Sequence, residues 1–290
     1  MASTLLSVLY YDLRTLVIGR LFAMDVLGYY NRGRQFPSLM VNNLDGSIQS
    51  VMFPALSAYQ DNLERMRSMM RRTIITSAFL VFPMMAGMAV IAEPMVKVVL
   101  TDTWLPSVPF LRIFCATYAL RPIQGANLQA IKALGRSDVF LNLELIKRFL
   151  SVIILVLTIP YGVYVIAWGS LASAIIGSFV NAYPNRSLLD YRYEEQIKDV
   201  LPSLLLSLFM AGVVYVAGFL PLAAAAALAV QIVLGILVYF GLANFFKLEC
   251  FRYLLHMIRT RGHGDEGVPK VKEIEEKQDI QDIQEEDNRL

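Results

Sequence analysis

Residues 139–160 read VFLNLELIKRFLSVIILVLTIP, a segment long enough to cross a bilayer as one helix. About 20 apolar residues in an α-helix span the roughly 30 Å of hydrocarbon. The first half of this segment nevertheless contains Glu144, Lys147 and Arg148. A charged side chain at that depth costs about 2.5 kcal/mol or more, so it is usually kept in a wet or protein-lined interior. The segment therefore predicts a membrane-spanning helix with a polar site beside it.

The composition of the whole chain is that of a polytopic membrane protein. Of its 290 residues, 56% are hydrophobic and 17% are charged, and the mean hydropathy is +0.52. These values lie outside the range of ordinary soluble domains. We expect an all-α protein whose partners include membrane lipids and exclude nucleic acid.

Eight apolar segments are candidates for transmembrane helices, because a spanning segment must satisfy its own backbone hydrogen bonds. Four prolines within three of these segments are expected to bend the helices or to free backbone carbonyls: Pro37, Pro54, Pro83 and Pro122. The eight segments are 3–24, 35–58, 73–92, 107–131, 139–160, 162–183, 201–219 and 222–246.

The chain divides into four parts by composition. Residues 1–184 are expected to form a six-helix transmembrane lobe, and residues 185–247 a cytoplasmic linker with two additional transmembrane helices. Apolar residues at helical spacing in 248–261 predict an amphipathic helix at the membrane interface. Residues 262–290 are highly charged, and we expect a disordered cytoplasmic tail. From Asp265 onward ten acidic residues face four basic ones, which leaves the membrane part basic.

The distribution of Lys and Arg predicts the orientation, since cytoplasmic loops carry the excess of positive residues. The links after the second, fourth and sixth segments contain nine such residues, and the links on the other side contain three. Both termini are therefore expected in the cytoplasm.

Polar residues inside the expected spans share helix faces. Ser38, Asn42, Asp45 and Gln49 follow steps of four, three and four, and Glu144 can pair with either neighbouring cation on its own helix. Six cations (Arg14, Arg20, Arg112, Arg121, Lys147 and Arg148) face three anions (Asp12, Asp45 and Glu144) at membrane depth, which favours an anionic cargo.

Structural interpretations of these groups remain open. Arg20, Arg112 and Asn181 lie near span ends, where they are typical interface anchors. The polar stripe of 35–58 is also compatible with interhelical hydrogen bonds, and Glu144 with a purely structural ion pair. Asp12 and Arg14 lie about 200° apart around a helix axis, so they cannot both point at one cavity.

Signatures of an enzyme are lacking. Both histidines, His256 and His263, follow the last span, and no catalytic or nucleotide-binding motif occurs. Cys115 and Cys250 are too far apart in the sequence to suggest a metal site. We expect neither enzymatic activity nor a cofactor.

Three stretches carry a resemblance to a known family: LVIGRLFAMDVLGYYNRGRQFPSL (16–39), AEPMVKVVLTDTWLPSVPFLRI (92–113) and QAIKALGRSD (129–138). Together they resemble the polysaccharide transporter branch, the Wzx-type flippases, of the multidrug/oligosaccharidyl-lipid/polysaccharide exporter superfamily. The chain has Asp102 where that family usually has glycine. The resemblance covers roughly residues 1–247.

The resemblance implies two six-helix lobes around a central cavity, often followed by two extra helices. Residues 1–184 would be the second lobe, and the partner would be a missing N-terminal lobe or a second copy. The implied function is transport of polyprenyl-diphosphate-linked oligosaccharide across the bacterial inner membrane, for surface polysaccharide synthesis. Residues that would bind substrate are Arg14, Asn42, Gln49, Arg121, Gln124, Lys147 and Arg148, with Asn127 also near the sugar. Residues that would couple transport to an ion are Asp12, Asp45 and Glu144.

Two other functions remain as alternatives. A cation-coupled drug exporter of the same superfamily would be expected to have a net acidic cavity. A membrane polysaccharide polymerase or ligase would be expected to carry a large extracytoplasmic loop, whereas the expected outer links are short.

Overall fold

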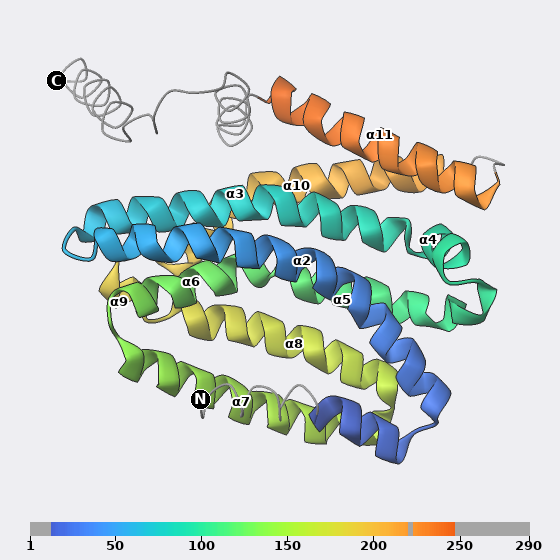
Figure 1. Cartoon of the computed structure of the whole chain (residues 1–290), viewed down its shortest axis with the longest axis horizontal. Coiled ribbons are helices and arrows are strands. Elements are labelled where there is room, and N and C mark those ends of the chain that lie inside the picture. The colour runs from blue at the N-terminus through green and yellow to red at the C-terminus, as the bar shows by residue number, and fades with distance from the viewer. Residues whose placement is uncertain (1–12, 220–222, 247–290) are drawn as a thin grey trace. The chain divides into compact units, whose positions relative to one another are not determined.

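The computed structural model describes residues 13–219 and 223–246, and these residues are almost entirely helical, without a strand among them (Figure 1). The all-α prediction is confirmed. Asp12 and the expectations for 248–261 and 262–290 lie outside the described residues. Residues 13–21 are helical and precede α2 (Met24–Ala58), α3 (Leu63–Val90), α4 (Ala92–Val99), η1 (Asp102–Ser107), α5 (Val108–Ala119), α6 (Arg121–Ala133), α7 (Ser137–Thr158), η2 (Ile159–Tyr161), α8 (Val163–Ala182), α9 (Asn185–Leu188), α10 (Tyr193–Ala217) and α11 (Ala224–Phe245).

Four helical stretches of the described part are long and apolar enough to cross a membrane: Leu63–Val90, Val163–Leu188, Tyr193–Ala217 and Ala224–Phe245. The helix α7 has the required length but carries three ionisable residues in its first half, and α5 and α6 are each short. The chain is therefore a multi-pass membrane protein. Its helices α5, α6 and α7 are too short or too polar to be recognised as membrane spans by length and composition alone.

The start of α2 differs from the sequence prediction. The helix begins at Met24 rather than at residue 35, so Arg32 and Arg34 lie in a helix and not in a link. Gly33 lies in this first part of α2, where α5 approaches the helix closely. A Cβ at residue 33 would lie 2.6 Å from the Cβ of Phe110 and 2.8 Å from the backbone nitrogen of Leu111.

The start of α3 was also placed too late. The helix begins at Leu63 and not at residue 73, because Asn62 caps it by accepting a hydrogen bond from the backbone N–H of Arg65 at 3.1 Å. The basic cluster expected in a link (Arg65, Arg67, Arg71 and Arg72) is thus the first part of this helix.

Pro122 interrupts the expected helix 107–131. The structure has two helices there, α5 and α6, which meet at Leu120, with Pro122 in the first turn of α6. Proline lacks the backbone N–H that a continuous helix would need at this point. In contrast, Pro37, Pro54 and Pro83 lie inside α2 and α3 without ending them, and α2 changes direction along its length in Figure 1.

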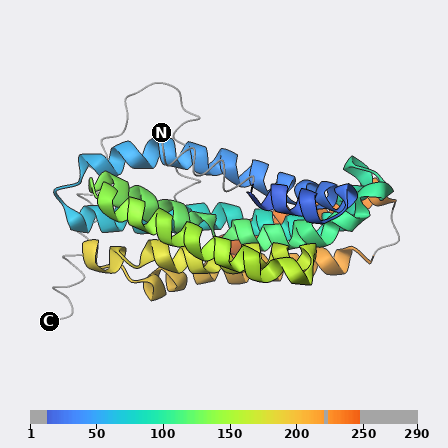
Figure 2. The same ribbon diagram turned by 90° about the horizontal axis from the view of Figure 1, so that it is seen from below.

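The helices within 13–246 run broadly along one direction, as the two views of Figures 1 and 2 show. The helix α3 packs on α10, which packs on α11, while α2 packs on α5 and α6. The helix α8 contacts α5, α6 and α7. Helices from the N-terminal end and the middle of the chain therefore surround one region between α2, α6 and α8.

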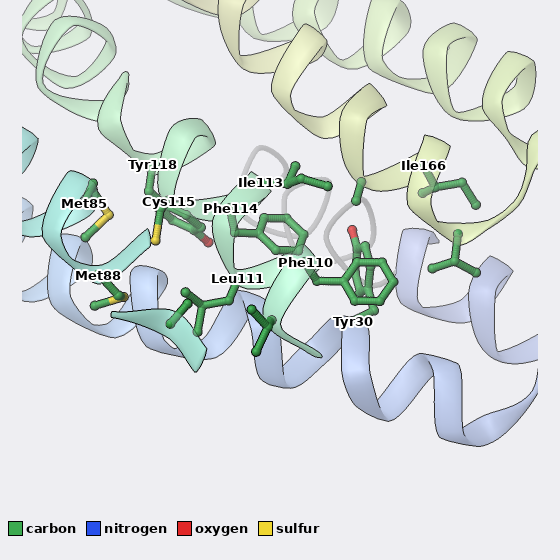
Figure 3. Close-up of a cluster of buried hydrophobic side chains, with 14 of the residues drawn as sticks. Tyr30, Met85, Met88, Phe110, Leu111, Ile113, Phe114, Cys115, Tyr118 and Ile166 are labelled. Carbon is green, nitrogen blue, oxygen red and sulfur yellow. The ribbon is translucent and has the colours of Figure 1, made fainter. Parts of the chain in front are cut away.

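Aromatic packing fixes α2 against α5. Tyr30 is 1% exposed, and its ring meets those of Phe110 and Phe114 edge to face at 5.8 and 5.1 Å between centroids (Figure 3). The ring of Phe110 also stacks on that of Tyr164 at 4.6 Å, which ties α8 to the same cluster. Such pairs add to the burial of the rings themselves.

A buried amide network joins α6, α9 and α10. Asn127 donates to Gln196 Oε1 at 2.7 Å, Gln196 donates to Asn127 Oδ1 at 3.1 Å, and Asn185 donates to the same Oδ1 at 2.6 Å. Tyr191 donates to Asp199 at 2.6 Å, and burial together with this hydrogen bond raises the pKa of the Tyr191 phenol, so it stays protonated. These contacts anchor the linker between α8 and α10.

Replacing Gly33 by alanine is expected to lower the free energy of unfolding by about 1–3 kcal/mol, because a methyl group there overlaps α5. The matched control is Gly46→Ala in the same helix, where nothing lies within 4 Å of the added Cβ. That change is expected to leave stability unchanged or to raise it by up to about 1 kcal/mol. Thermal unfolding in detergent measures both, and equal melting temperatures would contradict the close approach.

Candidate functional site

A cavity of about 380 Å³ lies among the helix 13–21, α2, α5, α6, α7 and α8. Its lining includes eight charged residues, six of them cationic and two of them carboxylates. They are Arg14, Arg34, Asp45, Arg121, Lys132, Glu144, Lys147 and Arg148. The described lining therefore has four more positive than negative groups, and a wall of this kind suits an anionic ligand.

Most residues predicted for the site line this cavity. They are Arg14, Gln49, Arg121, Gln124, Lys147 and Arg148 among the substrate-binding set, and Asp45 and Glu144 among the ion-coupling set. Whether they bind a ligand or an ion stays a prediction, but the structure brings them together from four separate segments of the chain: 13–21, α2, α6 and α7.

The placement of Asn42 differs from the prediction. It is exposed on α2 and does not line the cavity. Asn42 lies three positions before Asp45, which is about 60° around the helix axis. It is therefore at the edge of the cavity-lining face of α2, which presents Tyr30, Arg34, Asp45 and Gln49. A small bend of α2 is enough to turn such a residue outward.

Asn127 is not a cavity residue either. Its amide is used in the buried network with Asn185 and Gln196, and it also donates to the carbonyl of Ile123 at 2.7 Å. It lies on the side of α6 that faces α9 and α10. We therefore assign Asn127 to the joint between these helices and not to sugar contact.

Arg14 is held by three serines from α7 and α8. Its guanidinium donates to Ser151 at 2.9 Å, to Ser173 at 3.1 Å and also to Ser170. Ser170 and Ser173 each donate their own hydroxyl proton to a carbonyl one turn earlier in α8, so their oxygens are oriented to accept from the cation. The arrangement fixes a positive charge at one end of the cavity.

Glu144 pairs with both cations on its own helix, as its spacing predicted. Lys147 Nζ lies 2.5 Å from one carboxylate oxygen and Arg148 Nη2 lies 3.4 Å from the other. All three side chains are 18–22% exposed, so this cluster is partly open. One carboxylate serves two cations, and the cluster keeps a net positive charge.

Helices α2 and α6 add amide groups to the same cavity, beside their charged residues. Gln129 donates to Gln49 Oε1 at 2.7 Å, and Gln124 donates to the carbonyl of Ala174 in α8 at 2.7 Å. Arg121 lies over the ring of Tyr118 with 5.5 Å from Cζ to the ring centroid. This wall of the cavity therefore contains amide and aromatic groups as well as cations.

Several polar lining residues were not predicted for the site, and three of them were expected in other places. Arg34 and Lys132 were assigned to links, and Asn181 was interpreted as an interface anchor. Asn181 is in fact 1% exposed. Arg34 lies eleven residues, or three turns, before Asp45 on the same helix face, so an earlier start of α2 would have revealed it. Arg20 and Arg112 are exposed and do not line the cavity.

Comparison with known proteins agrees with this architecture. A family model described as "Polysaccharide biosynthesis protein" matches residues 1–109. The lipopolysaccharide biosynthesis protein WzxC of Escherichia coli is 26% identical over 151 residues, which are 52% of this chain and 31% of WzxC. The teichuronic acid biosynthesis protein TuaB of Bacillus subtilis is 23% identical over 220 residues, 73% of this chain and 45% of TuaB.

The solved structure of the lipid II flippase MurJ, in an inward closed conformation, superposes with a TM-score of 0.73 at 18% identity. The match covers 88% of this chain and 53% of MurJ, so the two share the fold over that length. The predicted resemblance to polysaccharide transporters and flippases is confirmed. The chain spans less than half the length of the two curated relatives and about half of MurJ.

Changing Glu144 to Gln is expected to lower the free energy of unfolding by about 2 kcal/mol, because Lys147 and Arg148 then share a partly buried site without their carboxylate. The matched control is Asp138→Asn, which breaks the exposed pair with Arg136 near the start of the same helix. That change is expected to leave the melting temperature nearly unchanged. Equal losses in the two variants would show that the Glu144 cluster is not buried as described.

Proposed function

We propose that this chain forms one lobe of a flippase that moves polyprenyl-diphosphate-linked oligosaccharide across the bacterial inner membrane. The observation that carries the proposal is the set of six cations and two carboxylates around one cavity. A diphosphate ester is an anion with several acceptor oxygens, and Arg and Lys side chains are its usual partners in proteins. The glycan would serve surface polysaccharide synthesis.

The cations of the cavity divide into a fixed group and a releasable group. Arg14 is held by three serine hydroxyls, whereas Lys147 and Arg148 are both paired with the Glu144 carboxylate. An arriving phosphate competes with the Glu144 carboxylate for these two cations. Binding would therefore transfer positive charge from Glu144 to the cargo.

Glu144 and Asp45 are the candidates for coupling transport to an ion. When a phosphate takes over Lys147 and Arg148, Glu144 is left as a carboxylate at membrane depth, which is costly without a counter-ion. A proton or a sodium ion would restore neutrality at that point. Asp45 lies close enough to Arg121 for an electrostatic interaction and would respond in the same way.

The printed names of the similar proteins support this class of cargo. One is named for lipopolysaccharide biosynthesis, one for teichuronic acid biosynthesis and one as a lipid II flippase. A cationic drug would meet charges of its own sign in the cavity, so a drug exporter is disfavoured by the same geometry that supports the flippase. We propose that the chain has no enzymatic activity of its own.

The lobe requires a partner for alternating access, since transporters of this kind rock one repeat against another around a fixed site. The outer face of α2 supports this part of the proposal. Asn42, Asn43, Ser47 and Ser50 are exposed in the middle of the helix, where hydrocarbon is an unfavourable neighbour for amides and hydroxyls. A second lobe or a second copy of the chain would face these four polar residues across water. The termini of both lobes would lie in the cytoplasm.

The cavity cations can be tested by the binding of polyprenyl diphosphate to the full chain in nanodiscs. Lys147→Gln and Arg121→Gln are each expected to weaken binding about tenfold, which corresponds to ~1.4 kcal/mol. Arg136→Gln is the control, because Arg136 is an exposed cation outside the cavity. Unchanged affinity in both cavity variants, or an equal loss in the control, would remove the proposed role.

The polar face of α2 can be tested with single cysteines in a chain in which Cys115 and Cys250 are replaced. In liposomes, Ser47→Cys is expected to react with a water-soluble maleimide, since the face borders water or a polar partner. Phe149→Cys on the exposed apolar side of α7 is expected to stay unreacted in lipid. Labelling of Phe149→Cys alone would contradict the assignment, and a disulfide between two Ser47→Cys chains would identify the partner as a second copy.

A further inference from the structure

Asn181 is an unusual member of the cavity wall. It lies near the end of α8, is 1% exposed and lines the cavity. Neither its Oδ1 nor its Nδ2 has a hydrogen-bond partner within the described part of the chain. Buried amides in folded proteins are nearly always hydrogen-bonded, so a side chain left in this condition needs an explanation.

The other carboxamides of the cavity do not share this condition. Gln49 and Gln129 bond to each other, and Gln124 donates to the carbonyl of Ala174. An unsatisfied buried amide destabilises a fold, and an apolar residue of similar size would remove that cost. Residues that lower stability in this way are typical of functional sites, where a ligand supplies the missing partner.

The position of Asn181 relative to the cations is defined by α8. Ser170 and Ser173, which accept hydrogen bonds from Arg14, line the cavity from the same helix as Asn181. Asn181 follows Ser173 by eight residues, about 12 Å along the helix axis. The side chain of Lys147 lies against α8 between these points, at Gly177. A Cβ added to Gly177 would lie 3.6 Å from Cδ of Lys147. Asn181 is therefore one helical turn beyond a cation of the diphosphate site.

We propose that Asn181 binds the first sugar ring of the cargo, through two adjacent ring hydroxyls. This inference rests on the proposed function, because it assigns the diphosphate to the cations around Lys147. A carboxamide offers one acceptor and two donor hydrogens on neighbouring atoms. Two vicinal hydroxyls match it, one donating to Oδ1 and the other accepting from Nδ2.

We expect the amide to reach the cavity by a rotation of the side chain. Both amide atoms are covered in the structure described, and no hydrogen bond within it holds them in place. Turning the amide toward the cavity therefore breaks no hydrogen bond of Asn181 itself. The cavity lining also includes the amides of Gln49 in α2 and Gln129 in α6.

The test compares the binding of two lipids to the full chain in nanodiscs: polyprenyl diphosphate and polyprenyl-diphosphate-linked glucose. The glucose-bearing lipid is expected to bind the unmodified chain about tenfold more tightly, because the ring adds hydrogen bonds to an unsatisfied site. Asn181→Leu is expected to abolish this difference, to leave the affinity for the bare diphosphate lipid unchanged and to raise the melting temperature. A third lipid, in which the ring lacks two adjacent hydroxyls, is expected to bind the unmodified chain no better than the bare lipid.

Ser178→Ala is the matched control. Ser178 lies on the same helix, is fully buried and also has an Oγ without a partner among the described residues, but it does not line the cavity. This variant is expected to keep the tenfold preference for the sugar-bearing lipid. A preference retained in Asn181→Leu, or equal binding of the deoxy and glucose lipids to the unmodified chain, would overturn the assignment of Asn181. Failure of even the bare diphosphate lipid to bind would instead overturn the proposed function.

Discussion

The structure depends on keeping charged side chains away from hydrocarbon in the middle of a membrane protein. Arg14 meets this constraint through hydroxyls from two other helices, and Glu144 meets it through cations on its own helix. The contacts of Arg14 require α7 and α8 to lie side by side with their polar faces turned to the same region. The packing of these helices and the existence of the cavity are thus consequences of one energetic requirement.

The apolar core provides the rigid frame around this polar region. Tyr30, Phe110 and Phe114 lock α2 to α5, and Gly33 allows the two helices to approach without a side chain between them. The interruption at Leu120 then redirects the chain, so that α5 belongs to the aromatic core and α6 carries amides and Arg121 into the cavity wall. A single continuous helix would have presented both sets of residues along one straight line.

The cavity combines groups that are fixed with groups that can change partners. Arg14 donates to neutral hydroxyls of α7 and α8, whereas Lys147 pairs with the Glu144 carboxylate. In the function proposed above, this difference would couple the arrival of a phosphate to the protonation or ion binding of a carboxylate. The buried joint of Asn127, Asn185 and Gln196 fixes α6 to α9 and α10.

Hydrophobic length and helical periodicity in the sequence predicted much of this protein. The segments 139–160, 162–183 and 222–246 agree with α7, α8 and α11 to within two residues, and the pairing of Glu144 with Lys147 and Arg148 followed from spacing alone. The signal was strong there because each helix is bounded by a proline, a glycine or a charged turn. Polar starts of helices, as in α2 and α3, carry no such signal.

Only the tertiary structure decided which polar residues meet. Arg34 and Lys132 line the cavity, whereas Asn42 does not and Asn127 lies in a buried joint. Asn181 lies in the cavity wall without a hydrogen-bond partner among the described residues. Periodicity defines the angle of a residue around its own helix, but the neighbour at that angle depends on how helices distant in sequence bend and pack. A deviation of a few tens of degrees therefore separates a cavity residue from an exposed one.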